Sequence, residues 1–457
     1  MLQGAIGVVV AAALAGGCAH AAPAPSLRLR PCGAASDRAE CGWLDVPEDP
    51  VRPRGHTIRL AVTVLRADQP RPGAPPLYHL DGGPGVAASG ARSFYSGPGR
   101  LYRRYHDLVL VDQRGTGQSG ALRCPDIEAR GPLEEQYTGT DVDRCRNRLA
   151  ARADLTHYGT ADAAADLDRV RAALGHDRID LWALSYGTQL AQIYLRAFPG
   201  RVRRAVLVGT APLDFATPLH HAEGAQRVID KLFAACRADA ACHGAFPQLE
   251  DSWRLVLAGV ARTGPAREAI RRLLGTTTSQ RGLPLLIDRA ARGDSGPLLA
   301  ALRGGPDPVA EGLYLSNACA EGTLRISPTD SDRFTRGTFL GDYRIRNQLA
   351  ACRRWPVRAV APSFVAPVRS PAAVLVLAGG MDATTSPEGA RQVCAALGNC
   401  RFIEVADLAH APFDLDRWQE GDCLDRIAAA FFDQPRPAPL DTGCLARMHP
   451  PPFDIGR

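Results

Sequence analysis

The stretch Ile179-Asp180-Leu181-Trp182-Ala183-Leu184-Ser185-Tyr186-Gly187 joins an apolar run to a sharp turn, and a segment with a helical pattern follows at residues 188–198. A strand, a tight turn with a serine at its apex and a helix form the layout of a nucleophile elbow. The G-x-S-x-G pattern is met with Ala183 in place of its first glycine. By itself this pentapeptide is also compatible with a serine that caps an ordinary strand-to-helix turn. Its partners along the chain therefore decide the interpretation.

Two polar residues further along the chain follow predicted strands. The apolar run 373–378 predicts a buried strand, and Asp382 follows it on a glycine-containing loop. Residues 401–405 predict the next strand, and His410 follows that one. Both residues are thus expected at the carboxyl ends of strands, where α/β sheets place their sites.

A serine hydroxyl needs a base that accepts its proton and an acid that orients the base. We predict Ser185 as the nucleophile, His410 as the base and Asp382 as the acid, in the chain order Ser, Asp, His. Asp407 and Asp414 are weaker alternatives for the acid.

The third part of such a site is an oxyanion hole made of backbone N–H groups. One donor comes from the residue after the nucleophile, here Tyr186. The other is expected from the glycine-rich loop 81–85, which follows the predicted strand 77–80. Within that loop we favour the N–H of Gly83, because glycines let the backbone approach a substrate closely.

These motifs resemble the α/β-hydrolase fold, and more narrowly its proline iminopeptidase and tripeptidyl aminopeptidase group. The resemblance covers residues 77–208 and 371–432 and rests on Gly82-Gly83-Pro84-Gly85, Val111-Asp112-Gln113-Arg114-Gly115-Thr116-Gly117-Gln118-Ser119, Ser185-Tyr186-Gly187-Thr188 and the Asp382 and His410 segments. It implies a mainly parallel central sheet flanked by helices. Asp81 stands where many iminopeptidase-type relatives carry histidine, so we expect its carboxylate to point away from the oxyanion or to be paired.

A second glycine pattern lies at residues 115–120, which fit the letters of the dinucleotide fingerprint G-x-G-x-x-G. Such a loop must open directly into a helix. Residues 121–125 instead predict a loop, so nucleotide binding is not expected. The resemblance makes the segment a structural loop that braces the site.

Far more chain separates Ser185 from Asp382 than one strand and two helices need. The excess has mostly helical patterns, and we interpret it as a large helical cap inserted before the acid-bearing strand. An independent domain of unrelated role is the alternative. The predicted division is a signal peptide at 1–21, a first core part at 26–211, the cap at 212–368, a second core part at 369–434 and a proline-rich tail at 435–457.

An aminopeptidase must recognise a free α-amine, and relatives in the group use acidic residues for this. Glu321 is the first choice here, because a bridge from Cys319 to Cys352 would fix its position, and Glu311 and Glu223 are the fallbacks. A solvated carboxylate of the cap is the alternative interpretation for each of them.

The chain has 13 cysteines. Cys18 lies in the predicted signal peptide, which leaves twelve cysteines in the rest of the chain. An even number of cysteines in an exported chain indicates disulfides. Reduced core cysteines are the alternative, and no cysteine or histidine spacing typical of a metal site occurs. We predict that close sequential neighbours pair: Cys32 with Cys41, Cys124 with Cys145, Cys236 with Cys242, Cys319 with Cys352, Cys394 with Cys400 and Cys423 with Cys444.

The first residues predict export from a bacterial cytoplasm. The apolar run 5–15 is too short to span a bilayer, and Ala19-His20-Ala21 offers a cleavage site. The protein is then periplasmic or secreted. Alternatively, a lipoprotein signal ends before Cys18 and leaves a lipid anchor there. The small net charge of +6 and the lack of a basic–aromatic cluster exclude a nucleic-acid partner.

Together these features predict an exported serine hydrolase that needs no metal or cofactor. The first choice of substrate is a peptide, from whose N-terminus one residue or a short peptide is released. A carboxylesterase that acts on small esters is the second, since the same groups cleave both bonds. A catalytically inactive binding protein is the third. The sequence does not indicate an oligomeric state.

Overall fold

The computed structural model describes residues 27–304, 308–410, 412–434 and 438–456. The predicted signal segment 1–21, including Cys18, lies outside the described residues. Within the described part, one nine-stranded sheet has the order β1-β2-β3-β5-β4-β6-β7-β8-β9. Its strands are β1 (Arg30–Pro31), β2 (Ala39–Pro47), β3 (Thr57–Leu65), β4 (Leu77–Leu80), β5 (Leu108–Val111), β6 (Ile179–Leu184), β7 (Val202–Val208), β8 (Ser370–Gly379) and β9 (Gly398–Val405).

Neighbouring strands pair in parallel along the part of the sheet formed by β5, β4, β6, β7, β8 and β9. The strands β1, β2 and β3 form an antiparallel extension beside β5. The central strand β6 is buried along its whole length, which explains its nearly continuous apolar sequence. The predicted mainly parallel α/β sheet is therefore confirmed.

Alternating side chains of β6 enter two separate cores. Leu181 and Ala183 pack into one core with apolar residues of α4 and α5, whereas Trp182 and Leu184 pack into the other with residues of α1 and α16. This follows from the two-residue period of a strand. The helices outside the β7–β8 interval are α1 (Arg92–Ser96), α2 (Pro125–Glu128), α3 (Gly139–Ala150), α4 (Thr160–Ala173), α5 (Tyr186–Ala197), α15 (Pro387–Leu397) and α16 (Cys423–Asp433).

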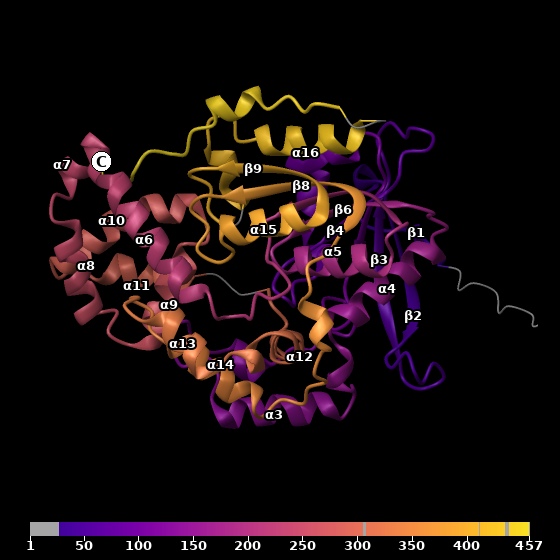
Figure 1. Cartoon of the computed structure of the whole chain (residues 1–457), viewed down its shortest axis with the longest axis horizontal. Helices are drawn as coiled ribbons and strands as arrows, with labels where there is room; N and C mark the ends of the chain where they lie inside the picture. Colours follow the sequence, from indigo (N-terminus) through magenta and orange to yellow (C-terminus); the bar gives the residue numbers. More distant parts are fainter. Residues whose placement is uncertain (1–26, 305–307, 411, 435–437, 457) are drawn as a thin grey trace, which may run out of the picture.

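The interval between β7 and β8 is helical, and Figure 1 shows α7, α8, α10 and α11 grouped to one side of the strands, with α12 and α14 below them. Several of these helices share an apolar core of their own, which includes Ile229, Ile270 and Ile287. The helices of this interval are α6 (His221–Ala238), α7 (Ala240–Ala245), α8 (Leu249–Ala258), α9 (Gly264–Leu273), α10 (Thr277–Ala291), α11 (Gly296–Arg303), α12 (Glu311–Glu321), α13 (Pro328–Thr335) and α14 (Tyr343–Cys352).

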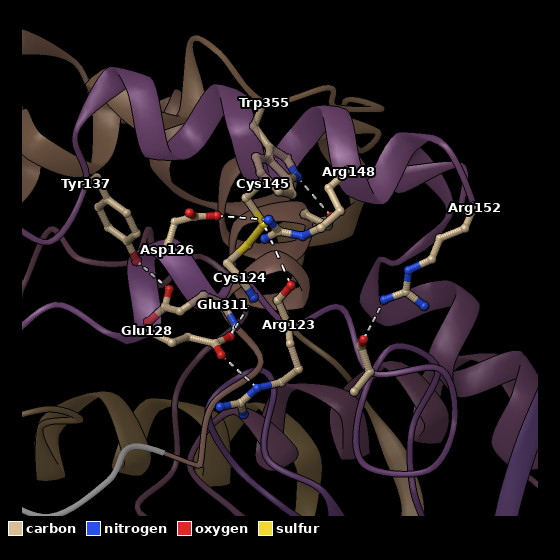
Figure 2. Close-up of a disulfide and its surroundings, with 12 residues drawn as sticks. Arg123, Cys124, Asp126, Glu128, Tyr137, Cys145, Arg148, Arg152, Glu311 and Trp355 are labelled. Atoms are coloured by element: carbon tan, nitrogen blue, oxygen red, sulfur yellow. Dashed lines mark hydrogen bonds and ion pairs between the residues drawn. A yellow bond between two sulfur atoms is a disulfide. The ribbon is translucent and has the colours of Figure 1, made fainter.

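The structure pairs the twelve cysteines in the predicted combination, with Cα atoms of each pair 5.2–5.8 Å apart. Figure 2 shows the Cys124–Cys145 bridge, which joins the start of α2 to α3. The Cys319–Cys352 bridge joins α12 to α14. The second bridge matters for the site, because both helices contribute residues to the cavity described below.

We expect the double variant Cys319→Ser/Cys352→Ser to lose about 2–4 kcal/mol of unfolding free energy, measured by denaturant titration. The bridge closes a loop with a sequence separation of 33, so its removal frees much of the unfolded chain. The matched control is Cys236→Ser/Cys242→Ser, whose separation of only 6 predicts a smaller loss. Free thiols at these positions in a non-reducing peptide map would contradict the pairing.

Candidate active site

Ser185 occupies the turn between β6 and α5 with a backbone φ of 54°. A positive φ is costly for a residue with a Cβ atom, so its surroundings must hold the turn. The Ser185 N–H donates to the Val208 carbonyl at 2.9 Å. A Cβ atom on Gly187 would lie 2.2 Å from the Leu80 carbonyl oxygen, so only glycine allows this approach to β4. Ala183 lies buried inside β6 with no positive φ, so its place in the pattern needs no glycine.

Loops that follow β8 and β9 bring Asp382 and His410 to Ser185. His410 Nε2 lies 3.0 Å from Ser185 Oγ, and His410 Nδ1 lies 2.8 Å from Asp382 Oδ2. Because an ionised carboxylate only accepts hydrogen bonds, Nδ1 donates to Asp382, and Nε2 is left to accept from the Ser185 hydroxyl. The structure thus brings the three predicted side chains into one hydrogen-bonded chain.

Asp382 is 1% exposed, and its carboxylate is fully engaged. Oδ1 accepts from the N–H groups of Thr384 and Thr385 at 2.7 and 2.8 Å, and the Thr385 hydroxyl donates to Oδ2 at 2.7 Å. Burial raises the pKa of Asp382, but the charge of His410 and the hydrogen bonds from His410 and Thr385 outweigh it, so the pKa lies below its usual value. The sequence did not indicate Thr385, because no pattern separates it from an ordinary turn threonine.

The two alternative acids lie elsewhere in the hydrogen-bond network. Asp407 Oδ1 accepts from Arg281 Nη2 at 3.0 Å, and Asp414 Oδ2 accepts from the Thr278 N–H at 2.6 Å. Within the described part of the chain neither carboxylate bonds to His410. Asp382 is the acid that the geometry supports.

The predicted oxyanion donors, Gly83 and Tyr186, line the same cavity as the serine and the histidine. Tyr186 is the first residue of α5, so its N–H has no acceptor within the helix. Gly83 has a φ of 108°, and no acceptor for its N–H is found among the described residues. The Gly82 N–H, by contrast, donates to Asp81 Oδ1 at 2.7 Å. Two backbone donors therefore remain available next to the serine.

Asp81 is paired, as the sequence led us to expect. Its Oδ2 lies 3.3 Å from His79 Nε2, and the His79 ring stacks on Trp182 with ring centroids 4.9 Å apart. Burial raises the pKa of Asp81, but the hydrogen bond and the charge of His79 outweigh it and lower the pKa. The Asp81 carboxylate thus has a hydrogen-bond partner in His79 and another in the Gly82 N–H.

The serine and histidine open into a cavity of about 350 Å³, to which both the core and the β7–β8 interval contribute side chains. One face of α12 forms part of its wall. The contributing residues follow each other at intervals of three or four, as one helical face requires: Glu311, Tyr314, Asn317 and Glu321.

Glu321 is buried and lines the cavity at the end of α12. Its two carboxylate oxygens accept from the Thr160 N–H and the Thr160 hydroxyl, both at 2.6 Å. The Thr160 hydroxyl also lies 3.0 Å from the Tyr186 hydroxyl, and Asn317 Nδ2 donates to both hydroxyl groups. Burial, partly offset by the hydrogen bonds from Thr160, raises the pKa of Glu321 to about 7.

The two fallback carboxylates differ in position. Glu311 lines the cavity, where Gln136 Nε2 and the Tyr137 hydroxyl donate to its oxygens at 2.9 Å each. Figure 2 shows the contact between Tyr137 and Glu311 near the Cys124–Cys145 bridge. The side chain of Glu223 is 59% exposed and does not line the cavity. The prediction for Glu223 is therefore corrected: its place on α6 faces solvent.

Basic residues of the cavity were not predicted. Arg271 and Arg272 of α9, Arg344 of α14 and His221 of α6 all line it. Their segments have ordinary helical patterns, so the sequence did not distinguish them from surface arginines or from a core histidine.

The loop at residues 115–120 has a structural role. Asp112 accepts from the Ser89 and Gln118 N–H groups at 2.8 and 2.9 Å, and the Ser119 hydroxyl donates to the Asp112 carbonyl at 2.7 Å. Turns, not a helix, follow the glycines. Among the described residues, no three His, Cys, Asp or Glu side chains gather as metal ligands, and no helix of that same set has the length and hydrophobicity to cross a bilayer.

The chain is similar to several curated hydrolases and peptidases. The chain is 29% identical over 218 residues to the putative hydrolase YuaR of Escherichia coli (strain K12), which covers 44% of this chain and 43% of that protein. It is 33% identical over 227 residues to the serine protease Hip1 of Mycobacterium tuberculosis (strain ATCC 25618 / H37Rv), and the alignment covers 45% of this chain and 42% of that protein. It is 34% identical over 195 residues to the tripeptidyl aminopeptidase of Streptomyces lividans, and the alignment covers 37% of this chain and 34% of that protein.

The chain thus spans less than half the length of these curated relatives. A family model described as the alpha/beta hydrolase fold matches a much longer stretch, residues 75–416. This stretch runs from β4 past β9 and contains the serine, the aspartate and the histidine. By its sheet, its elbow and this match, the chain belongs to the alpha/beta hydrolase fold family.

Proposed function

We propose that this protein is a serine peptidase that releases one residue or a short peptide from the N-terminus of a peptide. The observation that supports this most directly is the hydrogen-bonded chain Ser185–His410–Asp382, whose serine and histidine line a cavity. Relatives described as a serine protease and a tripeptidyl aminopeptidase support the choice of an amide bond.

In the proposed mechanism Ser185 Oγ attacks the substrate carbonyl carbon while His410 Nε2 takes the hydroxyl proton. Asp382 keeps Nδ1 protonated and stabilises the imidazolium that forms. The N–H groups of Gly83 and Tyr186 donate to the oxyanion of the tetrahedral intermediate. His410 then returns the proton to the leaving amine, and an acyl-enzyme forms. Water, activated by the same histidine, releases the acyl group and restores the serine.

Two carboxylates in the cavity favour a substrate with a free amine over a simple ester. Glu321 and Glu311 are both buried and line the space next to the serine. Glu321 accepts hydrogen bonds from the neutral groups of Thr160, and a buried carboxylate is more stable beside a positive charge, which a protonated α-amine would supply. An esterase needs neither residue, although the same triad would cleave an ester bond.

We also propose that the protein is exported to the periplasm or the medium. Six cysteine pairs lie at disulfide distance, and disulfides persist in oxidising compartments.

The variants Ser185→Ala and His410→Ala are expected to lower kcat by about 10⁶, and Asp382→Asn by about 10⁴, since each breaks the hydrogen-bonded chain. Steady-state hydrolysis of an activated substrate measures this loss. A fluorophosphonate probe should label the wild-type protein at Ser185 and leave Ser185→Ala unlabelled. If the wild-type protein resists the probe, it is an inactive binding protein and the proposal fails.

A substrate panel separates a peptidase from an esterase. We expect aminoacyl and tripeptidyl amides with a free N-terminus to give a higher kcat/KM than short-chain esters, relative to their uncatalysed rates. N-acetylated amides are the control for amine recognition. Turnover of esters alone would identify the second candidate, a carboxylesterase.

Exchange of Glu321 for glutamine should raise KM for free-amine substrates and spare N-acetylated ones. Burial raises the pKa of Glu321 to about 7, and a carboxyl group is charged above its pKa. The wild-type ratio of kcat/KM between free and acetylated substrates should therefore rise as the pH increases through about 7, and fall again above ~8, where the α-amine loses its proton.

In Glu321→Gln the rise near pH 7 should disappear, because the amide does not titrate. Glu223→Gln is the matched control, since this carboxylate lies outside the cavity. An equal loss of activity on free and acetylated substrates would show that Glu321 only supports the fold around Thr160.

A further inference from the structure

Three arginine side chains line the cavity that contains Ser185, and the proposed mechanism uses none of them. They are Arg271, Arg272 and Arg344. The side chains of Arg271 and Arg344 are only 10% and 15% exposed. A guanidinium group so far removed from water needs a compensating negative charge.

One carboxylate serves two of these groups. Glu268 Oε1 accepts from Arg271 Nη2 and from Arg344 Nη1, both at 2.6 Å. Burial raises the pKa of Glu268, but the charges of Arg271 and Arg344 outweigh it and bring the pKa to about 2, so the group is ionised at neutral pH. A single negative charge between two positive charges leaves the pair with an excess positive charge.

The remaining charges nearby do not remove this excess. Arg272 adds a third guanidinium group, 3.9 Å from Glu268. Glu311 is close enough for its charge to raise the pKa of Arg344. On this wall Glu268 and Glu311 thus give two carboxylates for three guanidinium groups, whereas Glu321 lies at the opposite end of α12.

Two buried nitrogen atoms of the same wall have no hydrogen-bond partner in the described part of the chain: Arg344 Nε and His221 Nδ1. His221 is 5% exposed and lines the cavity. Its pKa is lowered by burial first, and then by the charges of Arg271, Arg344 and His410. The histidine is thus close enough for the charges of the arginine pair and of His410 to act on it. Buried polar atoms without partners are uncommon in proteins, so this wall has donor capacity that the described side chains do not use.

We propose that Arg271, Arg272, Arg344 and His221 form a carboxylate-binding subsite of the cavity. The subsite determines specificity: it selects peptide substrates that carry a carboxylate, either an acidic side chain or the C-terminus of a short peptide. Guanidinium groups suit this ligand, because their planar donors match a carboxylate and the bonds are charge-assisted.

The inference rests on the proposed function, since it assigns the substrate class of the same cavity. Glu311 and Glu321 lie on α12, whereas Arg271 and Arg344 lie on α9 and α14. One cavity thus presents carboxylates and guanidinium groups from different helices. This arrangement complements a ligand with both an amine and a carboxylate.

The experiment compares substrates that differ only in the carboxylate. Glutamyl and glutaminyl p-nitroanilide test the side chain, and a tripeptide with a free or an amidated C-terminus tests the terminal group. We expect the wild-type protein to favour the carboxylate form of one pair by roughly 10- to 100-fold in kcat/KM. The pair that shows the preference identifies the source of the carboxylate.

The variants Arg344→Met and Arg272→Met should reduce this ratio to about one, because the loss of kcat/KM falls mainly on the carboxylate member of the pair. Arg272→Met guards against misfolding, because its side chain is 38% exposed and the Glu268 pairs with Arg271 and Arg344 stay intact. Arg336→Met is the matched control, since this arginine is 81% exposed and lies outside the cavity. No wild-type preference in either pair, or a preference that survives both variants, would overturn the subsite.

A second measurement does not depend on peptide cleavage. Glutarate should slow fluorophosphonate labelling of Ser185 in the wild-type protein more than its neutral diamide, glutaramide, and Arg272→Met should abolish the difference. Protection by glutarate without turnover of any peptide would leave the subsite standing and reject the peptidase proposal. Equal protection by both compounds would reject the subsite itself.

Discussion

The strained turn at Ser185 is the constraint on which the site depends. Its positive φ places the hydroxyl between the end of β6 and the start of α5, and the backbone is held by Val208 on one side and by the close approach of Gly187 to Leu80 on the other. The neighbouring parallel strands end at the same edge of the sheet as this turn. Their loops therefore deliver Gly83 after β4, Asp382 after β8 and His410 after β9 to one place.

Much of this core could be predicted from the sequence, because the signals are local and strong. The strands that bear the site are short apolar runs, and each polar residue follows one directly, so their meeting point follows from the parallel order. The cysteines were predictable for a similar reason, since each partner is a near neighbour along the chain. The presence of Ala183 in place of glycine did not affect the prediction of the turn, because Ala183 lies within strand β6.

The cavity wall was much harder to predict. Arg271, Arg344 and His221 come from three helices whose sequences show only an amphipathic pattern, and their meeting depends on how those helices pack. The same uncertainty explains Glu223: a helical pattern shows that a residue is polar, but not whether its face meets the cavity or solvent. Thr385 reaches both Asp382 and His410 through a turn that many sequences would form.

Helix α12 connects the inserted helices to the catalytic turn. Its last residue, Glu321, binds Thr160 at the start of α4, and Thr160 contacts the hydroxyl of Tyr186, whose N–H is the proposed oxyanion donor. Asn317 of the same helix donates to both hydroxyl groups. The Cys319–Cys352 bridge fixes this end of α12 to α14. These contacts link α12 to the side chain of Tyr186, the residue that follows the serine.

The length of α12 has a consequence for the size of the released product. Glu311 and Glu321 stand at opposite ends of the helix, a rise of about 15 Å. An extended peptide advances about 3.3 Å per residue, so the distance between the two ends of the helix equals the length of roughly four extended residues. If Glu321 is the amine anchor of the proposed peptidase, the amine binds near Thr160; if Glu311 is the anchor, the amine binds at the other end of α12. The choice between these two anchors would therefore affect how many residues the proposed peptidase releases.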